Sequence, residues 1–345
     1  MVQLGVNLTP IIVKRVVDLP ALRGRALAVD AFNTLHQFLA LIRTRDGTPL
    51  MDAEGRVTSH LVGLAFRTTR LIADYQMRLV FVFDGRPPPL KRAEVERRRQ
   101  LRRRAEEEYA AALEAADYAA AFSKAVMTGR LTADLIDDAK RLLDLLGIPW
   151  VQAPGEGEAQ AAYMARRGDV WAVNSRDYDS LLFGAPRLVR YVTIHGEEWL
   201  PSKGRARRLM PEVIDLETLL RHHGITREQL IDLAILVGTD FNLEVKGIGP
   251  KTALKLVKQH GGLEGLPPEV AARLPRNYDE IRRLYLEPEV TDDYRVEGGA
   301  LREDELYAFL CDERSFSRRR VEVVVDRMRR AHRQRSLREW LTEAP

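Results

Sequence analysis

The sequence is poor in cysteine and in long apolar runs. Cys311 is the only cysteine among the 345 residues. One thiol excludes a disulfide framework and a zinc site built from several cysteines, and it fits a reducing interior. No apolar run reaches the roughly 18 residues of a membrane span, and the N-terminus lacks a basic segment followed by an apolar one. We therefore expect a cytoplasmic protein that does not associate with a membrane.

A large excess of charge of one sign is also missing. The chain has 54 basic and 50 acidic residues, so any electrostatic function depends on where the charges are placed. Because 45% of the residues are hydrophobic, a chain of this length can bury a full core. This composition excludes a largely disordered protein.

Short apolar segments alternate with segments of helical periodicity. Residues 24–32 (GRALAVDAF) and 79–85 (LVFVFDG) predict strands, and SHLVGLAFRTTRLIADY between them predicts a helix. A further helix is predicted over 132–147, followed by a helix in GEGEAQAAYMARRG and a strand in DVWAVNSRDYD. This alternation predicts an α/β fold with a central, largely parallel sheet flanked by helices.

Carboxylates stand where the predicted strands end or the next helices begin. For any one of them, a helix cap or turn residue is the better explanation. For the whole set, crowded like charges would destabilise the fold unless cations neutralise them. Carboxylates without histidine or cysteine partners suit Mg²⁺, and two ions about 4 Å apart can hold both reacting oxygens of a phosphodiester. The sequence therefore predicts a metal site formed by Asp30, Asp84, Glu156, Glu158, Asp177, Asp179 and Asp240.

Several motifs together resemble the flap endonuclease family. They are, in order over nearly the whole chain, VDAFNTLHQFLALIRTRDGTPLMDAEGRVTSHLVGL, FVFDGRPPPLK, APGEGEAQAAYMA, SRDYDSLLFG, LVGTDF and GIGPKTALKL. The resemblance implies an archaeal-type 5′ nuclease of the xeroderma pigmentosum group G-like superfamily, with a PIN-like core. It implies cleavage of branched DNA carrying a 5′ flap, and 5′–3′ exonuclease activity besides. Okazaki fragment maturation and DNA repair are the implied processes, in the nucleoid of a prokaryote.

The resemblance also divides the carboxylates between two Mg²⁺ ions, which Mn²⁺ can replace. It implies that Asp84 and Glu158 bind the first ion, with Asp30 and Glu156 acting mainly through water. It implies that the second ion is bound by Asp177 and Asp179, shared with Glu158 and supported by Asp240.

The segment 91–108, KRAEVERRRQLRRRAEEE, begins basic and ends acidic without a helix breaker. From the residues alone, a solvated helix with (i, i+4) ion pairs is as good an explanation as a phosphate-binding helix. The resemblance favours the second, because the family has a helical arch here through which the free 5′ end passes. It implies an arch over about 86–130, with Lys91 and Arg98 as catalytic cations beside the scissile phosphate.

In the segment VKGIGPKTALKLVKQHGG, Gly247 and Gly249 bracket Ile248, and several lysines follow. A tight turn is the simple explanation, whereas backbone amides at a helix N-terminus can also bind phosphate. The resemblance implies a helix-two-turn-helix over about 228–262 that grips duplex DNA without reading its sequence. In that motif Gly247, Gly249 and Lys251 contact the backbone, and turn carbonyls hold a K⁺ ion.

TSHL and FSRRR resemble the family segments that receive a one-nucleotide 3′ flap and the adjoining duplex. The resemblance assigns DNA contacts to Thr58, Ser59, Arg318 and Arg319. An exposed, charged helix end remains the alternative for the arginines.

The C-terminal segment QRSLREWLTEAP resembles the motif that binds a sliding clamp of the proliferating cell nuclear antigen type. A terminal helix docked on its own core is the alternative. The predicted organisation is a nuclease domain over 1–330 and a tail over 331–345, in a monomer. The predicted clamp-binding residues are Gln334, Leu337, Trp340 and Leu341.

The sequence departs from the family pattern at two positions. The family usually begins Met-Gly, with the glycine near the active site, whereas the matching residue here is Gly5. His36 stands where the family has a tyrosine that stacks on a base next to the nick. Stacking by His36 would be less extensive and would depend on pH.

The predicted activity is structure-specific cleavage by two-metal catalysis. Within the superfamily, the alternatives are a bubble nuclease, a Holliday-junction nuclease or an exonuclease. Outside it, the alternatives are a DNA- or clamp-binding scaffold without activity and an RNA-cleaving nuclease. The complete set of carboxylates argues against a scaffold, and the arch and helix-two-turn-helix argue against an RNA nuclease.

Overall fold

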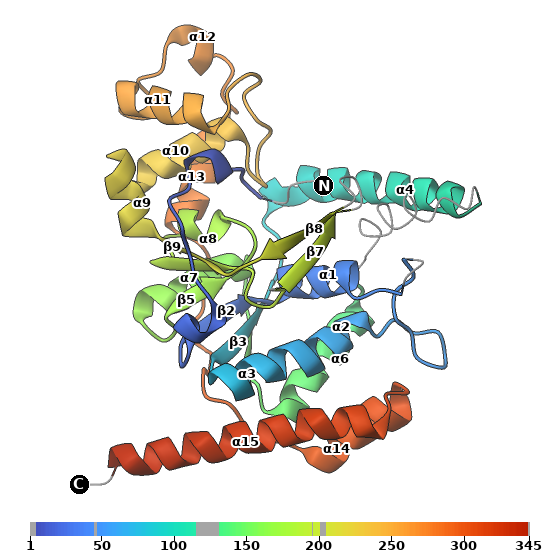
Figure 1. Cartoon of the computed structure of the whole chain (residues 1–345). Helices are drawn as coiled ribbons and strands as arrows, with labels where there is room; N and C mark the ends of the chain where they lie inside the picture. The colour runs from blue at the N-terminus through green and yellow to red at the C-terminus, as the bar shows by residue number, and fades with distance from the viewer. Residues whose placement is uncertain (1–4, 45–46, 115–130, 195, 201–204, 344–345) are drawn as a thin grey trace.

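A central sheet organises the chain, in a computed structural model that describes residues 5–44, 47–114, 131–194, 196–200 and 205–343. In the described residues the strand order is β1-β9-β6-β5-β2-β3-β4 (Figure 1). Neighbours from β6 to β4 run parallel, whereas β9 and β1 are antiparallel at one edge. The predicted α/β fold is therefore confirmed. The strands are β1 Arg15–Val16, β2 Ala26–Asp30, β3 Arg78–Phe83, β4 Trp150–Gln152, β5 Ala172–Asn174, β6 Arg187–Arg190 and β9 Glu212–Asp215, with β7 Gly196–Leu200 and β8 Arg205–Leu209 in a separate hairpin.

The central strands are apolar because both faces of the sheet are covered. Every residue of β2 is buried, as is typical of a parallel strand inside a three-layer fold. Alternate side chains enter different cores: Ala26 and Ala28 join one apolar cluster, and Leu27 and Val29 join the other.

Helices form the two outer layers. One apolar cluster packs against α7 Gly157–Arg167, α8 Asp179–Leu182, α9 Leu216–His223, α10 Arg227–Val237, α11 Pro250–His260 and α13 Tyr278–Leu286. The other packs against α1 Ala31–Leu41, α2 Ser59–Val62, α3 Thr69–Tyr75, α6 Ala133–Leu146, α14 Glu303–Tyr307 and α15 Arg318–Glu343. The short α12 covers Pro268–Ala271.

Local sequence explains where the helices begin and end. The Thr132 side chain accepts a hydrogen bond from the Leu135 amide, and Gly147 closes α6 in the left-handed conformation, as the sequence predicts. The single helix predicted before β3 is instead interrupted by a π-helical segment, Gly63–Thr68, between α2 and α3. The Thr69 hydroxyl bonds to the Ala65 carbonyl there, a side-chain contact that disturbs regular helical pairing.

The strand order creates a place for a ligand. From β2 the chain continues to β3 and β4 on one side, whereas β5 and β6 lie on the other side. The carboxyl ends of β2 and β5 therefore flank a topological switch point, where open α/β sheets bind their ligands.

Three helical parts surround this core in Figure 1. Helix α4 Arg92–Glu114 projects from the core, α10 to α13 gather at one end of the molecule, and α15 crosses the opposite end. The rest of the predicted arch lies outside the described residues. Helix α15 runs through residue 330, where the sequence places a domain boundary. No helix in the described ranges is long and apolar enough to cross a bilayer.

Candidate active site

Asp30 and Asp84 lie at the ends of adjacent strands. Asp30 ends β2 and caps α1: its Oδ1 accepts from the Asn33 amide at 2.9 Å and its Oδ2 from the Ser175 hydroxyl at 3.0 Å. Asp84 follows β3, and its Oδ1 accepts from the Gly157 amide at 2.7 Å. Strand ends and helix N-termini therefore orient both carboxylates.

Glu156 and Glu158 come from the start of α7. Glu156 occupies the N-cap position, and Glu158 lies in the first turn. Gly157 between them has no room for a side chain, because a Cβ there would lie 2.6 Å from Asp84 Oδ1. Glu158 Oε1 is buried and has no hydrogen-bond partner within the described part of the chain. This oxygen is the clearest indication that the site can accept a cation.

Asp177 and Asp179 follow β5. Asp177 Oδ2 accepts from the Asn33 side-chain amide at 2.6 Å. Asp179 Oδ2 accepts from the Val6 amide and its Oδ1 from the Tyr285 hydroxyl, both at 3.3 Å. Gly5 fits beside Asp179 only because it lacks a side chain, since a Cβ would lie 2.1 Å from Oδ2.

The structure brings Lys91 into this group of acids. Its Nζ forms ion pairs with Glu156 and, at 3.3 Å, with Asp240, which follows α10. Burial alone would lower the pKa of Lys91, but Glu156, Asp240 and Asp84 outweigh it and raise this pKa. Lys91 therefore stays charged. The side chain of Arg98, on α4, lies outside the described residues.

The carboxylates are electrostatically strained without a cation. Burial, with the negative charge of neighbouring acids, raises the pKa of Asp30 and of Asp84 to about 6 and that of Asp179 to about 7. The same causes raise the pKa of Glu158 and of Asp177 well above their ordinary values. Acids whose charged form is this unfavourable need a positive partner.

These residues fit hard divalent cations. All donors are carboxylate oxygens, which Mg²⁺ prefers, and the orphaned oxygen of Glu158 lies among them. In the described ranges, no three acidic, histidine or cysteine side chains are arranged so that they could together hold a metal ion. Mg²⁺ does not require three protein ligands, because this ion keeps several waters and is usually bound by one or two carboxylates.

Sequence reasoning missed residues that orient the carboxylates. Asn33 links Asp30 to Asp177 through its backbone and side chain. Its place three residues after a strand-end acid was a usable signal. Tyr285 from α13 is fully buried beneath Asp179 and packs on Phe183, with ring centroids 4.8 Å apart. No local pattern connects Tyr285 with the site.

The predicted DNA contacts fall into two groups. Thr58 and Ser59 are buried, and the Ser59 hydroxyl donates to the Ile42 carbonyl at 2.6 Å, so both residues pack the interior instead of facing DNA. Arg318 and Arg319 are exposed at the start of α15. His36 is half-buried on α1, the helix that begins after Asp30.

The predicted helix-two-turn-helix corresponds to α10, a turn and α11. Gly247 lies in the turn with φ of 83°, and Gly249 caps α11 directly before Pro250. Lys251 is exposed in the first turn of α11. Backbone amides and a positive charge are therefore both available at this helix start.

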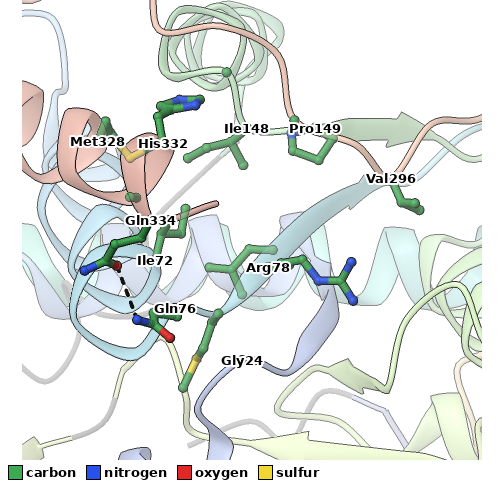
Figure 2. A pocket seen from close by; sticks show the side chains of 15 residues that line it. Gly24, Ile72, Gln76, Arg78, Ile148, Pro149, Val296, Met328, His332 and Gln334 are labelled. Atoms are coloured by element: carbon green, nitrogen blue, oxygen red, sulfur yellow. Dashed lines mark hydrogen bonds between the residues drawn. The ribbon is translucent and has the colours of Figure 1, made fainter. Parts of the chain in front are cut away.

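The predicted clamp motif lies on α15. The Gln334 carbonyl oxygen accepts from the Gln76 side chain at 3.3 Å, beside a cavity of about 400 Å³ that Ile72 and Met328 also line (Figure 2). The side chains of Leu337, Trp340 and Leu341 lie outside the described residues.

The site and the fold agree with known proteins. The chain matches the XPG N-terminal domain over residues 5–106 and the XPG I-region over residues 147–240. It is 49% identical to Flap endonuclease 1 of Aeropyrum pernix, with 96% of each chain covered, and 51% identical to that of Methanopyrus kandleri, with 91% of each covered. The chain belongs to the flap endonuclease family. The resemblance seen in its motifs is thereby confirmed.

Solved structures support the same conclusion for this flap endonuclease. The enzyme from Methanococcus jannaschii superposes with a TM-score of 0.75 at 39% identity, covering 96% of this chain and all of that one. The catalytic core of Rad2 in complex with DNA substrate gives a TM-score of 0.68 at 24% identity, with 91% and 96% covered. The second likeness shows a shared fold.

Proposed function

We propose that this flap endonuclease uses two Mg²⁺ ions to hydrolyse one phosphodiester at the junction between a single-stranded 5′ flap and duplex DNA. Family membership makes the chain a metal-dependent, structure-specific 5′ nuclease of DNA replication and repair. The observation that carries the two-metal proposal is the crowding of partly buried acids at the switch point, where Glu158 Oε1 is buried without a hydrogen-bond partner in the described residues. One cation could not neutralise carboxylates that extend from β3 to β5.

The residues of the site have different proposed roles in the reaction. The carboxylates of Asp84, Glu158, Asp177 and Asp179 would hold the two Mg²⁺ ions, which would supply positive charge to offset the negative charge that develops in the transition state. Lys91 supplies a further positive charge for a phosphoryl oxygen from the start of the arch. Asn33 and Tyr285 orient Asp177 and Asp179 through hydrogen bonds.

Duplex DNA is proposed to lie across the exposed basic helix ends. The turn before α11 offers backbone amides and Lys251 to phosphates, and its carbonyls are the proposed K⁺ ligands. Arg318 and Arg319 would contact the duplex next to a 3′ flap. Contacts of this kind recognise shape and charge, not base sequence.

The C-terminal part of α15 is proposed to bind a sliding clamp. Support comes from the sequence motif that begins at Gln334 and from the partly exposed position of that residue. A test compares the full-length protein with Trp340→Ala in calorimetric titrations against a clamp ring. Loss of binding with unchanged flap cleavage is expected, and binding that survives the substitution would contradict the assignment.

The main experiment measures cleavage of a labelled double-flap DNA that has one unpaired 3′ nucleotide. The protein and Asp179→Ala are compared in Mg²⁺ and in chelator. We expect a Mg²⁺-dependent cut at one position near the junction, lost in the variant while DNA binding is retained. Tight binding without a cut in Mg²⁺ or Mn²⁺ would contradict the proposed function and favour a scaffold.

A further inference from the structure

Arg190 is a buried cation next to the loop that carries Asp177 and Asp179. It ends β6, the strand beside β5, and is only 8% exposed. Its Nε donates to the Arg176 carbonyl at 2.8 Å, and its Nη1 donates to the Tyr178 hydroxyl at 2.5 Å. These two acceptors flank Asp177 in the sequence. The guanidinium therefore fixes the loop on both sides of Asp177 and directly before Asp179.

Tyr178 transmits this restraint to Asp179. The side chain is 2% exposed, its ring lies 4.3 Å from the guanidinium carbon, and its hydroxyl is 3.2 Å from Thr9 Oγ1. Tyr178 lies between Asp177 and Asp179 in the sequence. A fixed Tyr178 ring therefore restricts the relative orientation of the two aspartate side chains. A cation stacked on a buried aromatic ring contributes more than an exposed one.

The Arg190 guanidinium also contacts Tyr191 and Glu212. Nη2 donates to the Tyr191 hydroxyl at 2.9 Å, and Nη1 is 3.1 Å from Glu212 Oε2. Tyr191 has a φ of 63°, a left-handed conformation that is unfavourable for a tyrosine. Strained backbone of this kind persists only where its surroundings fix it, and it concentrates near functional sites.

Electrostatics explain why the loop needs such a restraint. Asp177 and Asp179 are separated by a single residue in a tight loop, so like charges on the two carboxylates repel each other before a metal binds. The hydrogen bonds from Arg190 reach the backbone and Tyr178 instead of the two carboxylates. The carboxylate oxygens consequently remain available to a cation.

We propose that Arg190 is a positioning residue for the second metal: it holds Asp177 and Asp179 in the arrangement that binds the ion. This inference rests on the two-metal site proposed above. Arg190 acts through the loop and does not touch the substrate. A planar guanidinium with several fixed donors suits this task, whereas lysine cannot reach the same set of acceptors.

The test measures metal binding apart from activity. Mn²⁺ binding to the full-length protein without DNA is followed by electron paramagnetic resonance, for the wild type, Arg190→Ala and Arg190→Lys. Arg187→Ala is the matched control, because Arg187 lies on the same strand but is partly exposed and faces Asp215 at 3.6 Å. Tyr178→Phe removes only a hydroxyl, so it remains informative if Arg190→Ala does not fold.

Arg190→Ala is expected to weaken one of two Mn²⁺ sites by about 10- to 100-fold, as loss of a residue behind metal ligands does. Tyr178→Phe should weaken the same site about fivefold, the equivalent of one hydrogen bond. Arg190→Lys should lie between alanine and wild type, and Arg187→Ala should match wild type. With flap DNA, kcat should fall in the Arg190 variants while KM stays near the wild-type value.

Two outcomes would contradict different parts of the proposal. Two Mn²⁺ ions in the wild type, with unchanged affinity in Arg190→Ala and Tyr178→Phe, would overturn the role of Arg190 alone. A wild type that binds a single Mn²⁺ ion would overturn the two-metal proposal, and the assignment of Arg190 to a second metal with it.

Discussion

At the scale of single residues, the carboxylates of the site repel one another, and a bound cation would offset this repulsion. Asp177 is half-buried beside Asp30, Asp179 and Asp240, and its pKa is raised by partial burial and by these neighbours. Such an arrangement lowers the stability of the metal-free protein. A residue that is proposed to bind metal therefore destabilises the metal-free fold.

Asp177→Asn should therefore separate activity from stability. Removing this charge is expected to raise the free energy of unfolding in chelator, because burial and the neighbouring acids make the charged form of Asp177 unfavourable. Cleavage in Mg²⁺ should fall by about 100-fold or more, because charge stabilisation in the transition state is lost. Denaturant titration in chelator and a single-turnover flap assay measure the two effects.

Glu297→Gln is the control for this substitution, since Glu297 is an exposed acid away from the site. It should change neither quantity. A metal-free Asp177→Asn protein that is less stable than wild type would show that the carboxylate is held by favourable contacts, contrary to the crowding argument.

His60 is a buried polar residue to which no catalytic role is assigned. Its ring is fully buried, and neither nitrogen has a hydrogen-bond partner in the described ranges. Burial, against a smaller opposing effect of Asp138, lowers its pKa from 6.5 to about 4.

The His60 pKa makes stability depend on pH in a defined direction. Between pH 6.5 and about 4 the unfolded chain binds a proton that the folded chain refuses, so stability falls as pH falls through this window. The loss should reach about 3 kcal/mol. His60→Leu should flatten the dependence measured by denaturant unfolding, whereas His222→Gln, at an exposed histidine, should not. An unchanged slope in His60→Leu would contradict the assignment.

At the scale of elements, apolar pattern predicts the inner strands well. β2 and β3 are continuous apolar runs because both faces are buried, and Asp30 and Asp84 at their ends mark the site. Cap residues predict α6 equally well. The π-helical segment 63–68 escapes such reasoning, because the hydroxyl contact that accompanies it does not alter the apolar pattern.

Element α11 carries a prediction about DNA. Lys251, Lys255 and Lys258 are exposed and spaced so that they lie along one side of the helix. Each phosphate contact contributes about 0.9 to the slope of log K against log salt concentration. The double substitution Lys251→Ala and Lys255→Ala should weaken binding of flap DNA at every sequence and reduce this slope by about 2, as measured by fluorescence anisotropy.

Arg295→Ala is the matched control, because Arg295 is exposed but lies outside α11. It should keep the wild-type slope. A double variant that binds flap DNA with an unchanged slope would place the duplex elsewhere on the molecule.

At the scale of the whole molecule, the sequence could not supply the packing of distant segments. Tyr285 and Val6 meet at Asp179 only because α13 and the N-terminal segment converge beside β5. Their separation along the chain leaves no periodicity to detect. The carboxyl ends of parallel strands in βαβ units meet at one edge of the sheet, so the sequence could predict that the acids gather there. The residues that hydrogen-bond to these acids come from distant segments, so the sequence could not predict them.

The whole fold should also respond to metal in a pH-dependent way. In the metal-free protein, Asp30 and Asp84 have a pKa of about 6 and Asp179 of about 7, whereas aspartate in an unfolded chain has about 3.9. Between these limits the folded state binds more protons than the unfolded state. The contribution of these three acids to the stability of the metal-free protein consequently falls as pH rises from about 4 to 7.

Mg²⁺ removes this penalty, because bound cations stabilise the charged acids. The difference in Tm between Mg²⁺ and chelator should therefore grow as pH rises from 5 to about 7.5 and then level off. The contribution of His60 is the same in both solutions and cancels in the difference. Calorimetry across this pH range, with Ca²⁺ in place of Mg²⁺ as a second cation, measures the effect. A gap that stays constant with pH would mean that the acids are already ionised in the empty site, and that crowding does not drive metal binding.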